Sequence, residues 1–306
     1  MGRTAARSTS DMRGGRLALS VLAALAVLTL LVAGCAQNAA EETLTPKIAP
    51  PAIGKAGVLR AAIDLSYPPF GGVVKGSRAG LDIDVASALA RELGLKLEIV
   101  EASPTAGAQL LRDGKVDVML GGVAIDAAVQ LDVAFAGPYV NDAPAIFAAA
   151  EGSATSGIPA ATMASIGAGT IAAQRESLAY WLVTEEYGEE TVLTFPTLRE
   201  AMSEVASGNV EYAVGDGLVG TYMLRQFPTL RLAGQLAPAA PVGVTVAKDA
   251  TELEQAVRDA LDRLSSGGVL ETLRRTWLAD APRFQGSTDA SGTLETSLTT
   301  ETSPAP

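Results

Sequence analysis

Two apolar runs, each stopping abruptly at a polar or glycine-rich loop, constrain what this chain can fold into. The first run, 58–63, stops at Asp64 and turns through the segment YPPF at 67–70. The second, 116–120, stops at Gly121-Gly122. Open α/β sheets bind ligands where their strands end in such loops. An Asp and a Tyr after one strand, and bare glycine backbone after another, therefore indicate a small-molecule cleft rather than a packed core.

Strand-like and helix-like segments alternate along the chain in two sets. The first set predicts strands at 58–63, 96–100, 116–120 and 133–135, with helices at 82–93 and 103–112. The second predicts strands at 170–173, 192–195 and 211–214, with helices at 178–187, 198–206 and 218–227. Such alternation favours mostly parallel sheets with helices on their faces. We therefore predict an α/β fold.

Two apolar segments, 143–149 and 242–247, are interpreted as strands that carry the chain out to a second lobe and back. Helices at 252–264 and 269–277 then return to the first lobe. The predicted organisation is lobe 1 at 57–143 and 248–284, and lobe 2 at 144–247 with the hinge strands. Two crossings permit hinge closure over a ligand.

The two ends of the chain are expected to lie outside that fold. Four arginines precede an apolar run at 17–33 and then Gly34-Cys35, which is typical of an export signal. The segment VAGC at 32–35 fits a bacterial lipobox, in which Cys35 becomes the lipidated first residue; an uncleaved membrane anchor is the alternative. Residues 35–56 are interpreted as a tether, and 285–306, which are poor in apolar residues, as a disordered tail.

Composition restricts the chemistry. The chain has no histidine, and Cys35 is its single cysteine, so we expect no metal site, no cofactor and no enzyme activity. Loss of the leader takes the formal net charge from −11 to −14, because four arginines and one aspartate leave with it. Nucleic acid, which selects basic faces, is not an expected partner.

Five ordered motifs resemble family 3 of the bacterial extracellular solute-binding proteins, the amino-acid-type receptors of ABC importers. They are the strand that ends at Asp64, the YPPF turn at 67–70, the helix start GLDID at 80–84, GKVD at 114–117 and FAGPY at 135–139. The resemblance covers about 57–278. It implies a two-lobe periplasmic-binding-protein-like (type II) fold, a permease partner, a monomer, and a lipid-anchored receptor on the extracytoplasmic face.

The resemblance also implies which residues bind the ligand. Asp216 would hold the ligand's ammonium, Tyr67 would lie against the ligand, and Asp64 would lie near its amine or side chain. The remaining candidates are the backbone of Gly122 and Ala124, Ser177 at a helix start, and Phe70. Structural roles compete with each: helix or loop caps for Asp216 and Asp64, and packing for the two aromatics.

One departure from the family pattern bears on the ligand. Family receptors carry an arginine that clamps the ligand carboxylate, and Val129 stands at that position here. A valine cannot replace a guanidinium. Three interpretations stay open: an amine or cationic ligand, an amino acid held by a substitute such as Arg175 or Gln130, and a pair of lobes that serves signalling without transport.

A different class, the periplasmic dehydratases that share this fold, is also open. The resemblance links them to elimination of water and carbon dioxide from a prephenate-like acid, which needs a general acid and a cationic grip on carboxylates. The missing arginine disfavours this class.

Overall fold

The computed structural model describes residues 2, 44–150, 161–278 and 281–284, so the predictions for Cys35, the leader and the tail lie outside the described residues. A first five-stranded sheet has the order β4-β1-β5-β12-β6. Its strands are β1 (Val58–Ile63), β4 (Lys96–Glu101), β5 (Val118–Met119), β6 (Ala134–Asp142) and β12 (Ala240–Val246). β1 runs parallel to β4 and β5, whereas β12 is antiparallel to β5 and β6.

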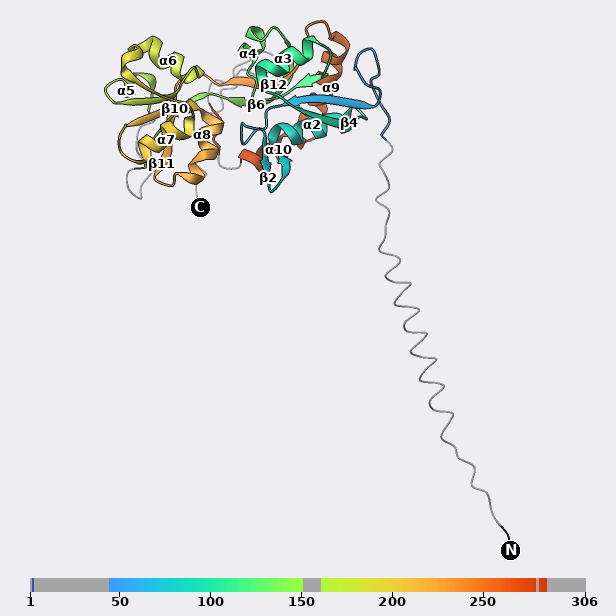
Figure 1. Cartoon of the computed structure of the whole chain (residues 1–306), viewed down its shortest axis with the longest axis horizontal. Helices are drawn as coiled ribbons and strands as arrows, with labels where there is room; N and C mark the ends of the chain where they lie inside the picture. Colours follow the sequence, from blue (N-terminus) through green and yellow to red (C-terminus); the bar gives the residue numbers. More distant parts are fainter. Residues whose placement is uncertain (1, 3–43, 151–160, 279–280, 285–306) are drawn as a thin grey trace, which may run out of the picture. The chain divides into compact units, whose positions relative to one another are not determined.

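Five helices accompany the first sheet in the described chain (Figure 1). They are α2 (Leu81–Glu92), α3 (Pro104–Arg112), α4 (Ile125–Gln130), α9 (Thr251–Ser266) and α10 (Val269–Leu278). α2 buries an apolar stripe that includes Ile83, Ala86 and Leu89. α3 begins at Ser103, whose hydroxyl accepts from the Ala106 amide, as its sequence predicts.

The second sheet also has five strands, in the order β11-β7-β10-β8-β9. They are β7 (Pro144–Ala149), β8 (Ile171–Gln174), β9 (Val192–Phe195), β10 (Tyr212–Asp216) and β11 (Leu230–Gln235). The accompanying helices are α5 (Met163–Ile166), α6 (Leu178–Tyr187), α7 (Leu198–Ala206) and α8 (Gly217–Met223), with 3-10 turns at Glu189–Thr191 and Leu224–Gln226. The predicted α/β alternation is therefore present in both sheets.

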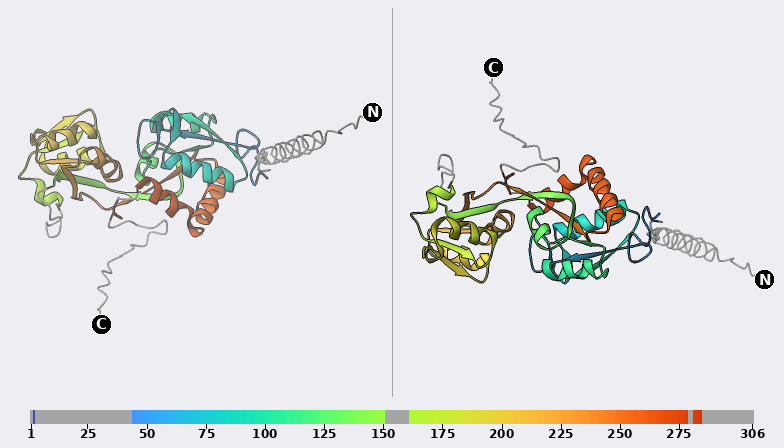
Figure 2. Two further views of the ribbon diagram at one scale, coloured as in Figure 1. Left: turned by 90° about the horizontal axis from the view of Figure 1, so that it is seen from below. Right: turned by 90° about the horizontal axis from the view of Figure 1, so that it is seen from above.

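The chain passes between the sheets twice. β6 leads through Ala143 into β7, and β11 leads into β12, as the ribbons of Figures 1 and 2 show. β12 pairs with β6 over seven residues and so belongs to the first sheet. The predicted lobe boundary at residue 247 is thus wrong for this strand, because its hydrogen-bond partners lie in lobe 1.

Several elements differ from the sequence prediction. The strand predicted at 133–135 is longer than expected. β6 continues to Asp142, so it carries the chain out of the first sheet up to the strand predicted at 143–149. β11, the hairpin of β2 (Gly72–Val74) and β3 (Ser77–Ala79), and the short helices α4 and α5 were not predicted.

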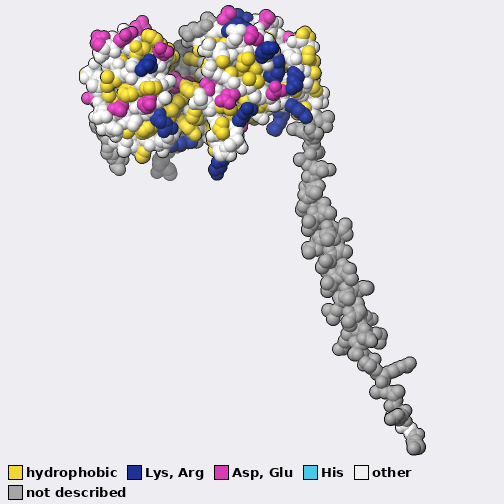
Figure 3. All heavy atoms as spheres, in the orientation of Figure 1, with side chains coloured by type: hydrophobic (Ala, Val, Ile, Leu, Met, Phe, Trp, Pro, Cys, Tyr) yellow, Lys and Arg dark blue, Asp and Glu magenta, His cyan; other side chains and the backbone are white. Residues whose placement is uncertain are grey.

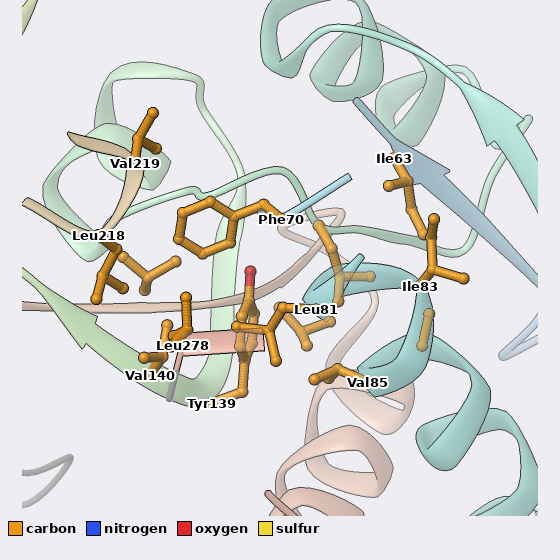
Figure 4. Close-up of a cluster of buried hydrophobic side chains, with 14 of the residues drawn as sticks. Ile63, Phe70, Leu81, Ile83, Val85, Tyr139, Val140, Leu218, Val219 and Leu278 are labelled. Atoms are coloured by element: carbon orange, nitrogen blue, oxygen red, sulfur yellow. The ribbon is translucent and has the colours of Figure 1, made fainter. Parts of the chain in front are cut away.

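The largest buried cluster joins residues of both sheets. Phe70, Tyr139, Val140, Leu218 and Val219 belong to it and are labelled in Figure 4. Phe70 is 1% exposed. Burying an aromatic side chain of this size stabilises a fold by about 1.5–3 kcal/mol relative to leaving it exposed. The cluster therefore fixes the YPPF turn against the hinge region.

Residues at both ends of the described domain pack on it, and at the N-terminal end this corrects the expectation of a tether at 35–56. Within the predicted tether, Ile48 and Ile53 are 5% and 1% exposed, and the Lys47 amide donates to the Leu93 carbonyl. At the other end, Phe284 is 8% exposed and lies against Gly217. Apolar side chains in otherwise polar segments anchor these ends. In the described part of the chain, no helix has the length and apolar character needed to cross a membrane.

Candidate ligand-binding site

The first candidate, Asp64, follows β1 directly. Its Oδ1 accepts from the Ser66 amide at 2.8 Å and from the Ser66 hydroxyl at 2.6 Å. This is the local turn in which Asp side chains commonly engage. The loop-capping role that competed with ligand contact is therefore present, and the half-buried carboxylate keeps its second oxygen for another partner.

The two aromatics of the turn have different environments. The rings of Tyr67 and Phe70 stack with centroids 5.7 Å apart and planes 10° apart. Tyr67 is half-buried, whereas Phe70 is buried in the core cluster. The prediction that Phe70 contacts the ligand is not supported by this position, because its ring has almost no accessible surface. Phe70 instead packs its ring against the ring of Tyr67.

The glycine loop after β5 lies against Tyr67. Gly122 has a φ of 67°, and a Cβ there would come within 2.9 Å of the Tyr67 ring carbon Cε1. Glycine is required on both counts. Ala124 forms a bridge with Val242, and its carbonyl accepts from the Ala128 amide at the start of α4. The sequence-predicted Gly122, Ala124 and Tyr67 are therefore brought to one edge of the first sheet.

Asp216 ends β10 in the second sheet, opposite Pro144 of β7. It occupies the position before α8, but its side chain makes no capping hydrogen bond. Burial raises the pKa of Asp216 to about 6. A half-buried, desolvated carboxylate that no helix amide satisfies is stabilised by a cation. The capping role that competed with ligand binding is therefore absent here.

Asp142 performs the capping instead, and the sequence analysis missed it. Its Oδ1 accepts from the Ala143 amide at 2.7 Å and from the Leu218 amide of α8 at 3.0 Å. Burial raises the pKa of Asp142 to about 7, and these amides together with Gly217 oppose the rise. Asp142 is the last residue of β6, so its side chain ties the first sheet to α8.

Ser177 begins α6, after β8 of the second sheet. Its Oγ accepts from the Tyr180 amide at 3.1 Å, which is an N-cap interaction. The preceding Glu176 has a φ of 60°. The cap uses the oxygen as an acceptor and leaves the hydroxyl proton available for a ligand.

A buried pair, Asp82 and Tyr139, lies behind the glycine loop. The Tyr139 hydroxyl donates to Asp82 Oδ1 at 2.5 Å. Burial raises the pKa of Asp82 to about 7. Both residues stand in motifs that carried the family resemblance, but they are 57 positions apart, so their contact could not be read from the motifs.

These features define a class. Two sheets of this strand order, two crossings between them, and polar groups at the strand ends are those of a two-lobed, type II periplasmic binding protein. The chain belongs to the bacterial extracellular solute-binding proteins, family 3, whose sequence model matches residues 59–280. Members of this family are extracytoplasmic solute receptors, and the resemblance drawn from the motifs is confirmed.

The chain is similar to binding proteins for amino acids and, over a shorter segment, to an enzyme. A putative ABC transporter arginine-binding protein of Escherichia coli is 23% identical over 228 residues, covering 72% of this chain and 91% of the relative. A solved ancestral cationic amino acid solute-binding protein is 26% identical, with a TM-score of 0.64, covering 72% of this chain and 96% of that one. A cyclohexadienyl dehydratase of Pseudomonas aeruginosa is 36% identical over 123 residues, covering 39% of this chain and 42% of the enzyme.

Proposed function

We propose that this protein is the lipid-anchored receptor of an ABC importer and captures a small cationic amine or amino acid between its two lobes. One observation carries the proposal: the half-buried carboxylate of Asp216 has no helix-capping hydrogen bond, and desolvation raises its pKa to about 6. Pairing with an ammonium would offset that burial. The similarity to arginine-binding and cationic amino acid-binding proteins supports the same ligand charge.

The rest of the proposed site has the chemistry expected for a cation. Tyr67 offers a ring face for a cation–π contact. The second carboxylate oxygen of Asp64 is a further acceptor. Asp64 follows a strand of the first sheet, whereas Asp216 ends a strand of the second sheet. On the face drawn in Figure 3, the described acidic and basic side chains are interspersed, so the proposed selectivity comes from the site rather than from the surface.

The ligand class can be tested with two probes that differ in a single group. L-Arginine carries an α-carboxylate, and agmatine is the same molecule without it. The family's carboxylate-clamping arginine is replaced by Val129, so we propose that this site gains little from the carboxylate. Calorimetry of the full chain in detergent with both probes is expected to give comparable affinities. Strong preference for L-arginine would show that a substitute clamp holds the carboxylate.

The variant Val129→Arg provides the complementary test. If the ligand has no carboxylate near this position, the new guanidinium is unpaired and repels a cation, so agmatine should bind more weakly. If L-arginine binds the variant more tightly than it binds the parent, the amine interpretation is contradicted.

The dehydratase alternative is tested directly. The local similarity to a cyclohexadienyl dehydratase is its one support. Incubation of the full chain with prephenate should give no aromatic absorbance product if the protein is a receptor. Turnover that survives purification of the chain would assign an enzyme instead.

A further inference from the structure

We propose that Asp82 and Tyr139 form a positioning pair that holds the glycine loop and the YPPF turn in place beneath the ligand, without touching the ligand. The inference rests on the proposed function for its location, since these two segments carry Gly122, Ala124 and Tyr67. It assigns the pair a role in affinity that the receptor function alone does not require.

The pair is inaccessible to a ligand. Asp82 is 0% exposed and Tyr139 is 7% exposed. Asp82 lies in the first turn of α2, and Tyr139 lies in β6, so the 2.5 Å hydrogen bond between them joins two elements of lobe 1. Figure 4 shows the ring of Tyr139 within the cluster that contains Phe70.

Backbone contacts link the pair to the YPPF turn. The Asp82 amide donates to the Phe70 carbonyl at 2.9 Å, and the neighbouring Leu81 amide donates to the Pro69 carbonyl at 2.9 Å. A shift of Asp82 is therefore transmitted to the turn that carries Tyr67. The turn in turn stacks Tyr67 on Phe70.

A second link runs to the glycine loop. The Gly122 amide lies close enough to lower the pKa of both Asp82 and Tyr139 against the effect of burial. The same glycine lies directly behind the Tyr67 ring, where a Cβ would come within 2.9 Å. Asp82 is therefore linked to both segments, to the YPPF turn through its backbone amide and to the glycine loop through its carboxyl group.

Burial of the Asp82 carboxyl group also costs the folded state free energy. Its Oδ2 is buried and has no hydrogen-bond partner. A buried unsatisfied polar atom calls for an explanation, because replacing the group by a better satisfied one would stabilise the protein. A positioning role supplies the explanation. The carboxyl group is the acceptor that the Tyr139 hydroxyl needs, and its ionisation gives a charge response to a cation bound at the site.

That charge response has a definite sign. The titratable groups that face the Asp82 carboxyl are Tyr139 from β6, which lowers its pKa by hydrogen bonding, and Asp64 after β1, whose charge raises it. A cation bound beside Asp64 and Tyr67 would favour the ionised form of Asp82. By linkage, affinity for a cation should rise as the pH increases through about 7, where Asp82 titrates.

The test uses the full chain in detergent, with Asp82→Asn and Tyr139→Phe as variants. Asp84→Asn is the matched control, because Asp84 lies two residues further along α2 and accepts from Trp277 Nε1 at 2.7 Å instead. The first readout needs no ligand: hydrogen exchange of peptides covering 66–71 and 120–124. Both pair variants are expected to exchange faster there, and the control is expected to match the parent. Unchanged exchange in both pair variants would overturn the proposal.

The second readout is calorimetry with L-arginine as the probe across the neutral pH range. Both pair variants should bind about tenfold more weakly, which corresponds to about one hydrogen bond; Asp82→Asn should lose the part of the rise in affinity near pH 7 and keep the part near pH 6 that Asp216 contributes. Loss of stability with unchanged affinity and pH profile would show a merely structural pair. If the parent binds neither L-arginine nor agmatine, the proposed function fails, while the exchange measurement still decides the role of the pair.

Discussion

Asp142 accepts a hydrogen bond of 3.0 Å from the amide of Leu218, across the point where the chain leaves the first sheet. The Gly217 amide donates to the Ala143 carbonyl at 2.8 Å in the same place. The first amides of α8 are thus satisfied by the hinge. Asp216, which immediately precedes α8, is left without a capping role. Because Asp142 caps α8, the carboxylate of Asp216 is available for the ligand in the proposed site.

Stability should fall as the pH rises from about 4 to about 7. Burial raises the pKa values of Asp82, Asp142 and Asp216 from 3.8 to about 7, 7 and 6 in the folded state. A raised folded-state pKa gives stability that is present at low pH and is lost between the unfolded and folded values. The half-buried Glu92 and Glu271 have lowered pKa values and act in the opposite direction, but below about 4.5.

Urea unfolding at a series of pH values measures this dependence. Asp142→Asn should flatten the curve in part, because one of the three titrating carboxyls is removed while an acceptor for the Leu218 amide is kept. A free energy of unfolding that rises from pH 4 to pH 7 would contradict the burial of these groups.

Gly122→Ala should weaken cation binding and destabilise the fold by about 1–2 kcal/mol from backbone strain alone. The added methyl would also meet Tyr67, since its Cβ would lie 2.9 Å from Cε1. Gly76→Ala is the matched control: Gly76 has a φ of 81° but nothing lies within 4 Å of its Cβ position. Calorimetry should show weaker cation binding for Gly122→Ala only. Equal losses of binding affinity in the two variants would rule out a role for the contact with Tyr67.

The extent to which sequence predicts this fold differs between elements. The strand at 58–63 and the helix at 178–187 match β1 and α6, because five of the six residues at 58–63 are apolar and because Ser177 caps α6, so each has a local signal. β11 was missed because Arg231 and Gly234 interrupt its pattern, and it is a strand through its pairing with β7. The β2–β3 hairpin was missed because it is short and leaves Val73 and Val74 exposed.

The site shows the same limit. Motifs placed Tyr67, Gly122 and Ala124 after their strands, and the structure brings these three together. The motifs could not assign the α8 cap, because Asp142 and Asp216 both precede short apolar stretches and only their spatial relation to Leu218 distinguishes them. The contact of Asp82 with Tyr139 depends on sheet order, which is a tertiary property.

The C-terminal end provides a sharp test of packing. Truncation after Phe284 should leave stability unchanged, whereas truncation after Arg283 removes a side chain that is 8% exposed. Loss of this aromatic contact with Gly217 should cost about 2–3 kcal/mol. Thermal unfolding of the two truncated chains measures the difference, and identical melting temperatures would show that the Phe284 contact contributes nothing.

Membrane attachment is tested at Cys35. If the lipobox at 32–35 is processed, Cys35→Ser should abolish lipidation and release the protein from membranes. Fractionation of cells that express the parent and the variant provides the measurement. Equal retention of both in the membrane fraction would contradict a lipid anchor at this residue and would favour the uncleaved anchor.

The most direct test of the account is the affinity of Asp216→Ala for L-arginine and agmatine, measured by calorimetry beside the parent. If Asp216 pairs with the ligand's cation, its removal should cost about 2–5 kcal/mol of binding free energy, the usual loss when one partner of a buried charge pair is deleted. Asp142→Asn, which keeps the acceptor for the Leu218 amide, serves as the control and should bind as the parent does. Parent-like affinity of Asp216→Ala for both probes would contradict the central claim.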